Sequence, residues 1–440
     1  MGYKNIIILG FGIEGKSAFS YLKKKYPKAA FAIADKNKID SSFRGRTFTG
    51  KNYLKNIGGY DLIVKSPGIS LREKDIAKAV KKGARLTSAT ELFFEACRGK
   101  IIGVTGTKGK STTSTLIYEI LKKAKIKSSL VGNIGNPPLD FLDKNSGKGK
   151  IFVYELSSYQ LNDLKKSPWI AVFLNIFPDH MPYHGSFKNY QKAKANIEKF
   201  QGGDDCFIYN SDYRFLANLA KSAKGRAVSY TKTCSAKNGA VYYKNEKIIS
   251  QKDIKLLGKH NLENIFACIT AAKILKVSNT VIREAIKNFK GLPHRLELAR
   301  VYKGIKFYDD AISTTPESTI AAIEVFGDNL GTIILGGENR GYNFSRLAKI
   351  ILKYRVKNVV LFPDSGAKIW KEIVKACRAR GEKLPLKLET KKMSQAVKFA
   401  YKNTEEGKVC LLSTASPSYS IFKNFIDKGN QFKKEVKKLK

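Results

Sequence analysis

Residues 101–112 read IIGVTGTKGKST, and this stretch decides how the middle of the chain folds. Its apolar first third predicts a buried strand, which enters a glycine-rich turn and leaves it as a helix. Gly106 and Gly109 allow backbone N–H groups to converge on phosphate oxygens. The Lys110 ammonium would reach the β- and γ-phosphates of a nucleotide, and the Ser111 hydroxyl would bind Mg²⁺. The stretch therefore predicts a site for a nucleoside triphosphate.

The turn departs from the most common phosphate-loop spacing, because Val104 stands where the first glycine of that motif would be. A lysine-containing turn without a ligand is the alternative. Strand, glycines, the Lys-Ser pair and helix nevertheless follow one another in the order that phosphate binding requires. We therefore expect these residues to bind ATP: Gly106, Thr107, Lys108, Gly109, Lys110, Ser111 and Thr112.

Two further glycine-rich turns, residues 10–15 (GFGIEG) and 336–341 (GGENRG), also follow apolar runs. One such turn per domain predicts three nucleotide-binding α/β domains in series. They are a Rossmann-like N-terminal domain at 1–97, a central P-loop domain at 98–296 and a C-terminal Rossmann-like domain at 297–440. Short apolar runs that alternate with helical stretches predict parallel sheets. The predicted strands are 6–9, 31–34, 62–64, 101–104, 151–154, 172–174, 207–209, 333–335, 359–362 and 409–412.

The composition is that of a soluble globular protein, with 43% hydrophobic and 27% charged residues among 440. No apolar run is long enough to span a membrane, and the N-terminus lacks the features of a signal peptide, so we expect a cytoplasmic protein. The six cysteines include no CxxC pair, which favours reduced, mostly buried thiols.

The net charge of +44 comes from 81 basic and 37 acidic residues. It could indicate nucleic-acid binding, or it could reflect lysines on solvated surfaces. The lysines are spread along the whole chain, which favours the second interpretation. The positive field would still help to recruit phosphorylated substrates.

One carboxylate side chain and one imidazole side chain follow predicted strands. Glu155 ends the run 151–155 and His180 lies shortly after the run 172–174. Side chains at the carboxyl ends of parallel strands face the ligand crevice, so Glu155 is a candidate second magnesium ligand. His180 could bind a metal through a neutral imidazole nitrogen, although a structural hydrogen bond is the alternative. Lys194 follows on a predicted helix, where solvent exposure is the ordinary expectation.

Several motifs occur in the order found in one enzyme family. They are 66–69 (SPGI), 132–135 (GNIG), 155–161 (ELSSYQL), 179–180 (DH), 258–264 (GKHNLEN), 291–297 (GLPHRLE) and 411–413 (LLS). With the phosphate loop, they make the chain resemble the Mur ligases over nearly its full length, and among them the MurD type.

The resemblance implies an ADP-forming ligase of peptidoglycan precursor synthesis in the cytoplasm. It would add D-glutamate to UDP-N-acetylmuramoyl-L-alanine through an acyl phosphate. ATP and two magnesium sites would be needed, no nucleic acid or membrane insertion is implied, and a monomer is expected. The C-terminal domain would close on the amino acid and ATP.

The resemblance also assigns roles to individual residues. Lys110, Lys194 and His180 would be catalytic, and Ser111 and Glu155 would bind the first magnesium. His180 and Lys194, the latter as a carbamate, would complete the metal sites. The remaining expected contacts are, for ATP, Asn261, Asn264, Arg295 and Asp310; for the UDP substrate, Gly12, Ile13, Glu14, Gly15, Asp35, Ser66, Pro67, Gly68 and Asn133; and for glutamate, Ser418 and Phe425.

The first glycine-rich turn has a second interpretation. The GxGxxG spacing at 10–15, followed by Asp35, is by itself a dinucleotide fingerprint that suggests NAD. The family resemblance instead implies that the helix N-terminus holds the UDP diphosphate and that the acid lies near uridine. Both interpretations depend on the same N–H groups and helix dipole.

Some positions depart from the family pattern. Lys108 replaces an asparagine in the phosphate loop, and Pro182-Tyr183 replaces Asp-Arg after the histidine. Ile312 stands where the resemblance predicts a lysine that binds a glutamate carboxylate. A relative that adds L-glutamate is therefore an alternative.

Two further alternatives belong to other groups of proteins. A folylpolyglutamate synthase-like ligase would lack the uridine-type first domain. A basic NTPase stimulated by nucleic acid would bind in a strongly salt-dependent manner.

Overall fold

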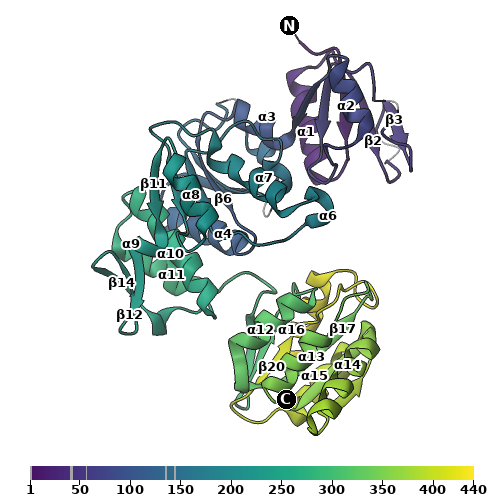
Figure 1. Cartoon of the computed structure of the whole chain (residues 1–440), viewed down its shortest axis with the longest axis vertical. Helices are drawn as coiled ribbons and strands as arrows, with labels where there is room; N and C mark the ends of the chain where they lie inside the picture. The colour runs from purple at the N-terminus through teal and green to yellow at the C-terminus, as the bar shows by residue number, and fades with distance from the viewer. Residues whose placement is uncertain (1, 40–42, 56, 134–135, 143–144) are drawn as a thin grey trace. The chain divides into compact units, whose positions relative to one another are not determined.

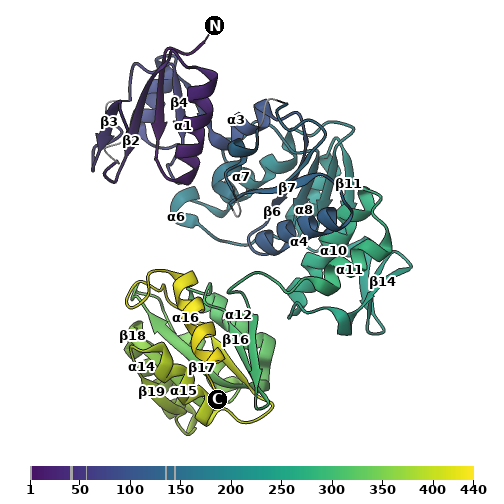
Figure 2. The same cartoon turned by 180° about the vertical axis from the view of Figure 1, so that it is seen from behind.

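The structure is a computed structural model that describes residues 2–39, 43–55, 57–133, 136–142 and 145–440. It separates into two compact units (Figures 1 and 2). The first comprises Met1–Ile254 with Lys259–Phe289, and the second comprises Lys255–Gly258 with Lys290–Lys440. Each unit is built mainly from parallel strands in sheets covered by helices, so the predicted α/β fold class is confirmed.

The first unit begins with a five-stranded parallel sheet in the order β3-β2-β1-β4-β5. Successive side chains of β1 point to opposite faces, as in any strand. Ile6 and Ile8 pack beneath α1 and α3, whereas Ile7 and Leu9 pack beneath α2. The elements are β1 (Asn5–Leu9), α1 (Ile13–Lys25), β2 (Ala30–Asp35), β3 (Arg46–Thr49), β4 (Leu62–Lys65), α2 (Lys74–Lys81), β5 (Arg85–Ser88) and α3 (Ala89–Ala96).

A six-stranded parallel sheet follows, in the order β11-β10-β9-β6-β8-β7. The strand of the phosphate loop, β6, is central, so its carboxyl end is flanked by the ends of β8 and β9. The strands are β6 (Lys100–Thr105), β7 (Ser128–Gly132), β8 (Ile151–Glu155), β9 (Ile170–Phe173), β10 (Cys206–Tyr209) and β11 (Arg226–Ser229).

Helices cover both faces of this sheet. The side chains of α7 and α8 pack into one core with the sheet, while α4 packs against α10 and α11. The helices are α4 (Lys110–Lys123), η1 (Pro138–Phe141), α5 (Ser158–Leu161), α6 (Met181–His184), α7 (Phe187–Lys199), α8 (Arg214–Ser222), α9 (Tyr230–Thr233), η2 (Gln251–Asp253), α10 (Lys259–Ile274) and α11 (Asn279–Asn288). A small antiparallel sheet consists of β12 (Cys234–Lys237), β13 (Ala240–Tyr243) and β14 (Glu246–Ser250).

The two parallel sheets of the first unit share one hydrophobic core through α3. Phe93 is fully buried and lies edge-on to Phe152 and Tyr154, with ring centroids 5.1 and 5.7 Å away. The Tyr154 hydroxyl also donates a hydrogen bond of 3.0 Å to the Thr90 hydroxyl. The first sheet is therefore fixed on the second by apolar packing as well as by polar contacts.

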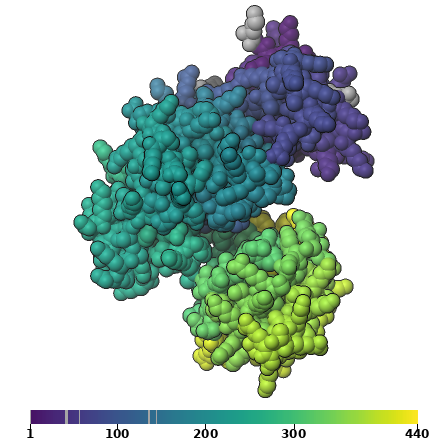
Figure 3. Space-filling model, viewed as in Figure 1, coloured from purple at the N-terminus to yellow at the C-terminus, as the bar shows by residue number. Residues whose placement is uncertain are grey.

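The second unit is a six-stranded sheet in the order β15-β16-β20-β17-β18-β19, parallel except for β15. Helices α12, α13 and α14 cover one face and α15 and α16 cover the other. Its green-to-yellow atoms form one rounded body (Figure 3). The elements are β15 (Glu297–Tyr302), β16 (Ile305–Asp309), α12 (Pro316–Phe326), η3 (Gly327–Asn329), β17 (Leu330–Gly337), α13 (Ser345–Lys353), β18 (Asn358–Asp364), α14 (Ser365–Arg380), β19 (Leu386–Glu389), α15 (Met393–Asn403), β20 (Val409–Leu412) and α16 (Phe425–Lys437).

Every predicted strand overlaps a strand of the structure, although the prediction 172–174 lies towards the end of β9 (Ile170–Phe173). All six cysteines fall in the described part of the chain and are free, and only Cys97 is half-buried instead of buried. Among the described residues, no helix has the length and hydropathy that a membrane span requires.

Candidate active site

The phosphate turn requires glycine at one position for two reasons. Gly109 is the residue before α4 and has a φ of 86°, in the left-handed region that favours glycine. A Cβ atom there would also lie 2.3 Å from Asn264 Oδ1. The turn is thus shaped to bring α10 against the N-terminus of α4, where a helix dipole favours anions.

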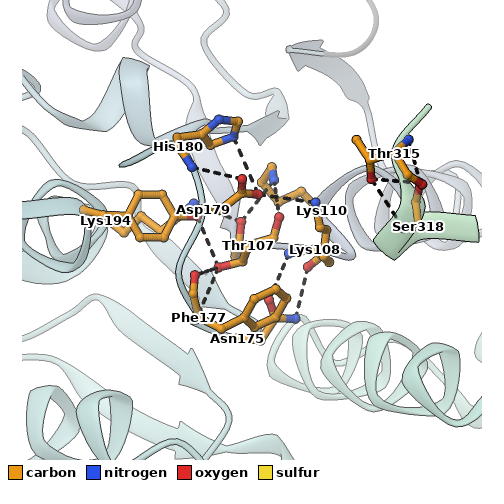
Figure 4. A network of polar contacts seen from close by, with 12 residues as sticks. Thr107, Lys108, Lys110, Asn175, Phe177, Asp179, His180, Lys194, Thr315 and Ser318 are labelled. Carbon is orange, nitrogen blue, oxygen red and sulfur yellow. Dashed lines mark hydrogen bonds and ion pairs between the residues drawn. The ribbon is translucent and has the colours of Figure 1, made fainter. Parts of the chain in front are cut away.

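Lys110 is held inside this turn (Figure 4). Its ammonium donates hydrogen bonds to the carbonyl oxygens of Gly106, at 3.0 Å, and Thr107, at 3.1 Å. A lysine cation at the start of α4 can exchange carbonyl partners for phosphate oxygens. The position therefore suits the predicted contact with a triphosphate.

Hydroxyl groups and one lysine ammonium make hydrogen bonds that support the phosphate turn. The buried Thr107 hydroxyl lies 3.1 Å from the carbonyl oxygen of Phe177, and the Tyr190 hydroxyl donates to Thr107 Oγ1 at 3.1 Å. The ammonium of Lys194 donates to Thr105 Oγ1 at 3.0 Å and to the Gly106 carbonyl at 2.9 Å. The lysine predicted from family resemblance is therefore buried directly against the phosphate turn.

Lys108, which departs from the family pattern, is fixed at both its peptide and its side chain. Its N–H donates to Asn175 Oδ1 at 2.9 Å, and its carbonyl accepts from Asn175 Nδ2 at 3.1 Å. Its ammonium lies 3.3 Å from Asp179 Oδ2. Burial alone would raise the pKa of Asp179, but the Lys108 ammonium and the neighbouring His180 hold that pKa below its usual value. The extra cation is therefore partly neutralised within the site.

Glu155 lies at the end of β8, as predicted, and is 1% exposed. Its Oε1 accepts a hydrogen bond of 2.9 Å from Asn133 Nδ2, and the Asn133 N–H donates to the Glu155 carbonyl at 3.2 Å. Its Oε2 is buried and has no hydrogen-bond partner among the described residues. A buried carboxylate oxygen without a partner is costly, and Mg²⁺ prefers oxygen ligands. The Glu155 carboxylate thus suits a cation such as Mg²⁺, and Ser111, the other predicted ligand, lies in the first turn of α4.

His180 lies immediately before α6, with a φ of 57°. Burial, and then the cations of Lys110, Lys108 and Lys194, lower its pKa, while Asp179 opposes the shift. A neutral imidazole nitrogen is the form that binds a metal. Its ring also lies 5.1 Å from the ring of Tyr159, which limits its orientation.

Burial lowers the pKa of Lys194 well below its usual range, and the neighbouring Lys110 cation lowers it further. The side chain is 1% exposed. Its two hydrogen-bond acceptors are neutral oxygen atoms, so among the described residues no carboxylate accepts a hydrogen bond from its ammonium. The amine is therefore more easily deprotonated than that of a surface lysine.

The predicted adenine-side asparagines begin α10. Asn261 and Asn264 are both buried, and Asn264 Nδ2 donates to Asn261 Oδ1 at 3.0 Å. Because Asn264 lies against Gly109, these amides adjoin the phosphate turn. Thr112 is buried in the first turn of α4.

In the first sheet, Asp35 and Ser66 hold the glycine turn by its backbone. Asp35 Oδ2 accepts from the Phe11 N–H at 2.6 Å, and the Ser66 hydroxyl donates to the Gly10 carbonyl at 2.9 Å. A Cβ atom on Gly15 would lie 2.0 Å from the Gly10 carbonyl oxygen, so only glycine permits this close turn. The other predicted residues of this site are Gly12 and Ile13, both exposed, Glu14, Pro67 and the exposed Gly68.

The second unit brings another set of predicted residues together. Asp310 is 2% exposed, and its Oδ2 accepts from the Ser413 hydroxyl at 2.8 Å. Burial raises the pKa of Asp310 to about 6. Arg295 is exposed, two residues before β15, and the Phe425 ring lies edge-on to His294, with centroids 6.0 Å apart.

Two residues of this unit bear on the predicted amino-acid contacts. The Ser418 hydroxyl is buried without a hydrogen-bond partner among the described residues. Ile312 is half-buried, and its N–H donates to the His294 carbonyl at 3.1 Å.

Some site residues were missed by sequence reasoning. Asn175 and Asp179 lie between β9 and α6. Only its position after a strand could have indicated Asn175, whereas Asp179 belongs to the DH motif but had no predicted role. Tyr190 lies four residues before Lys194 on α7, so both share one helix face. Ile134 and Gly135 of the GNIG motif lie outside the described residues.

Comparison with known proteins assigns a family to this arrangement. Residues 104–272 match the Mur ligase middle domain, and residues 4–88 match the MurD-like N-terminal domain of Mur ligases. The chain is 36% identical to UDP-N-acetylmuramoylalanine–D-glutamate ligase of Acetivibrio thermocellus, over 99% of this chain and 97% of that protein. It is 32% identical to the protein of the same name from Clostridium tetani, with the same two coverages.

Solved structures show the same fold. The structure of the UDP-N-acetylmuramate–alanine ligase MurC from Thermotoga maritima matches with a TM-score of 0.60 and 18% identity, over 99% of both chains. MurF from Thermotoga maritima in complex with ADP matches with a TM-score of 0.59 and 16% identity, over 99% of this chain and 95% of that chain. From the two domain matches and the full-length similarity above 30%, we conclude that the chain belongs to the Mur ligase family.

Proposed function

We propose that this protein is an ATP-dependent, ADP-forming ligase that adds D-glutamate to UDP-N-acetylmuramoyl-L-alanine. The observation that carries the proposal is the phosphate turn around Lys110, beside a buried Glu155 carboxylate oxygen that lacks a partner among the described residues. The curated relatives with 36% and 32% identity bear the name of this activity. The match of residues 4–88 to a MurD-like N-terminal domain favours it over a folate ligase.

We assign the binding of the UDP substrate, ATP and glutamate to three domains, at 1–97, 98–296 and 297–440. The first would bind the UDP substrate through Gly12, Ile13, Glu14, Gly15, Asp35, Ser66, Pro67 and Gly68, with Asn133 from the second. The second would bind ATP through Gly106–Thr112, Asn261 and Asn264, with Arg295 and Asp310 completing the nucleotide site. The third would bind glutamate through Ser418 and Phe425. The protein would act in the cytoplasm, as a monomer, in peptidoglycan precursor synthesis.

The reaction would proceed in two displacements. A carboxylate oxygen of the alanyl group attacks the γ-phosphorus of ATP, the bond to the β,γ-bridging oxygen breaks, and ADP leaves. The amine of glutamate then attacks the acyl carbon, phosphate departs, and the amine loses a proton as the amide forms. Lys110 and the N–H groups before α4 would stabilise charge on the transferring phosphoryl group.

Two magnesium ions would be held by this chain's oxygen and nitrogen ligands. Ser111 and Glu155 would bind the first, and His180 and a carbamate on Lys194 would bind the second. Bound magnesium would neutralise the charge of the triphosphate and orient it. The lowered pKa of His180 supports a neutral ligand there.

The carbamate would form on the buried Lys194 amine. Its nitrogen attacks carbon dioxide, a C–N bond forms and a proton is released. The product is an anion in place of a cation that has only neutral hydrogen-bond acceptors. The burial of Lys194 against the phosphate turn supports this modification.

The configuration of the glutamate needs a direct test, because Ile312 offers no cation for a carboxylate. The deciding experiment measures phosphate release with ATP, Mg²⁺ and UDP-N-acetylmuramoyl-L-alanine, while D-glutamate, L-glutamate and other amino acids are supplied in turn. Release with D-glutamate is the expected result, and the Lys110→Ala variant should abolish it. Release with L-glutamate alone would replace the proposed substrate, and no release with any amino acid would overturn the ligase assignment.

A further inference from the structure

Lys65 is a buried cation for which the proposed reaction has no use. It is the last residue of β4 and is 1% exposed. Its ammonium lies 3.3 Å from Asp163 Oδ2 and 3.3 Å from the Ser66 carbonyl oxygen. Asp163 follows α5 of the second sheet, so this ion pair joins the two sheets of the first unit. Lys65 directly precedes Ser66-Pro67-Gly68, the segment to which we assign the UDP substrate.

The Asp163 carboxylate depends on this pair. Both oxygen atoms of Asp163 are buried and have no hydrogen-bond partner among the described residues. Within that part of the chain, the ion pair with Lys65 is therefore the polar contact of this carboxylate. Removing one partner of a buried ion pair leaves an uncompensated charge, a costly state. The pair therefore holds β4 and the segment after α5 at one fixed separation.

A second contact fastens the other loop of the UDP site. Gln160 on α5 donates from Nε2 to Glu14 Oε1 at 2.8 Å, and Glu14 is in the first turn of α1. Gln160 cannot turn freely, because its Oε1 accepts from the Ser157 N–H at 2.9 Å and from the Ser157 hydroxyl at 3.0 Å. The segment 155–160 thus has Glu155 at one end and Gln160 at the other, where Gln160 contacts the glycine turn of the first sheet.

The segment around His180 makes contacts with the loop that follows β4. The Tyr183 hydroxyl lies 3.1 Å from the Pro67 carbonyl oxygen and 3.3 Å from that of Ile69. Arg72 donates a hydrogen bond to the His184 carbonyl. Tyr183 is one of the residues that depart from the family pattern, and these contacts give it a specific position in this chain.

We infer that Lys65, Asp163, Gln160 and Tyr183 are positioning residues, which hold the two UDP-binding loops at a fixed distance from the phosphate turn and the metal ligands. This inference rests on the proposed function. The loops at 12–15 and 66–68 are each tied to the stretch that carries Glu155 or the stretch that carries His180. A substrate anchored by its UDP end is thereby presented at one distance from the γ-phosphate of ATP. Misplacement by about 1 Å can cost roughly a hundredfold in rate.

The test separates positioning from binding and from stability. The variants Lys65→Met, Asp163→Asn and Tyr183→Phe are compared with the wild type in kcat, in Kd for UDP-N-acetylmuramoyl-L-alanine and for ATP by calorimetry, and in Tm. We expect kcat to fall about tenfold or more in Lys65→Met. Both Kd values should stay within about twofold, because each ligand keeps its own contacts. The double variant of Lys65→Met and Asp163→Asn should be no slower than the worse single variant.

Two controls complete the design. Lys65→Arg keeps the cation and should restore most of kcat, which a merely structural role would not require. Lys123→Met removes an exposed ion pair with Glu284 that does not join the sheets, and should leave kcat unchanged.

The outcomes are distinguishable. Wild-type kcat in a folded Lys65→Met and in Tyr183→Phe overturns the inference. If Lys65→Met does not fold, Tyr183→Phe, which removes a single oxygen atom, decides alone. Equal losses in kcat and in both affinities also overturn it, because they indicate a general loss of structure. An inactive wild type would instead contradict the proposed function.

Discussion

Lys194 shows how the surroundings of one residue set its chemistry. Its amine is buried against Thr105 and Gly106 and has a pKa well below that of a surface lysine. If it carries a carbamate, Lys194→Ala should lower kcat at least about a hundredfold, because a metal ligand is lost. Acetate should partly restore the activity, since a small carboxylate can occupy the space. Phosphate release with and without acetate measures both effects.

The same helix offers a matched control for this prediction. Lys192 is exposed on α7, so Lys192→Ala should retain wild-type activity and show no response to acetate. A Lys194→Ala variant that is active, or that acetate does not rescue, would remove the carbamate from the proposal.

His184 should make stability depend on pH. It is 3% exposed, its Nε2 lies 3.0 Å from the Ser158 hydroxyl, and burial lowers its pKa to about 4. The unfolded chain, with a histidine pKa of about 6.5, binds more protons than the folded chain between those values. Stability should therefore fall as the pH drops from about 6.5 to about 4.

The measurement is Tm against pH for the wild type and for His184→Gln, which cannot take up a proton. The variant should lose less Tm over that range. Identical slopes for the two proteins would show that His184 is not the group responsible.

The residues of the site were predictable to different degrees. Glu155 could be predicted from sequence, because an acid that ends a buried strand faces the crevice of a parallel sheet. Lys194 could be predicted only from the family resemblance, since it is one of 81 basic residues and its burial depends on how α7 packs on β6. Asn175 and Tyr183 donate hydrogen bonds to carbonyl groups of segments that are distant in sequence. Such contacts produce no pattern in the residues next to them.

At the scale of the element, the β6–α4 turn combines a strained φ with a close contact. Gly109→Ala should destabilise the protein by about 1–2 kcal/mol from its left-handed φ of 86°. It should also weaken ATP binding, because the new Cβ would displace the Asn264 side chain. Tm and calorimetry with ATP report the two effects separately.

Gly381 provides the comparison for the φ effect alone. It follows α14 with a φ of 63°, and a Cβ atom added there would meet open space, so Gly381→Ala should lower Tm without a change in ATP affinity. Equal ATP affinity in wild type and Gly109→Ala would contradict the role given to the contact with Asn264.

Strands at the centres of the sheets were predictable, but strands at the edges were not. β1, β6, β8 and β17 are buried on both faces and appear as apolar runs. The edge strands β3 and β19 read RTFT and LKLE, and most of their side chains are exposed. These segments form strands because they are hydrogen-bonded to a neighbouring strand, and their own sequence does not show a strand pattern.

At the scale of the whole molecule, the shared core should make the first unit unfold as one body. Phe93→Ala should cost about 3–5 kcal/mol. The loss should reach both parallel sheets, because Phe93 shares one core cluster with Ile6 and Ile8 of the first sheet and with Phe152 and Tyr154 of the second. The second unit has separate hydrophobic clusters and should keep its stability. Hydrogen exchange resolved by segment measures each sheet. Loss of protection confined to residues 5–88 would contradict a shared core.

The grouping of sheets into units could not be predicted from sequence. A domain boundary was expected close to Cys97, and α3 ends at Ala96. The aromatic pair on that helix nevertheless packs against residues more than fifty positions later. Apolar periodicity identifies the buried face of a helix, but it does not say which partner covers that face.

The position of Phe93 and Phe94 also has a practical consequence for truncation. A fragment that stops at residue 97 would expose both rings to water and should be prone to aggregate. A fragment that starts at residue 290 keeps both of its hydrophobic clusters intact and should be recoverable after limited proteolysis. The boundary between the two compact units, after Phe289, is therefore the site at which we expect the chain to be divided without exposing a core.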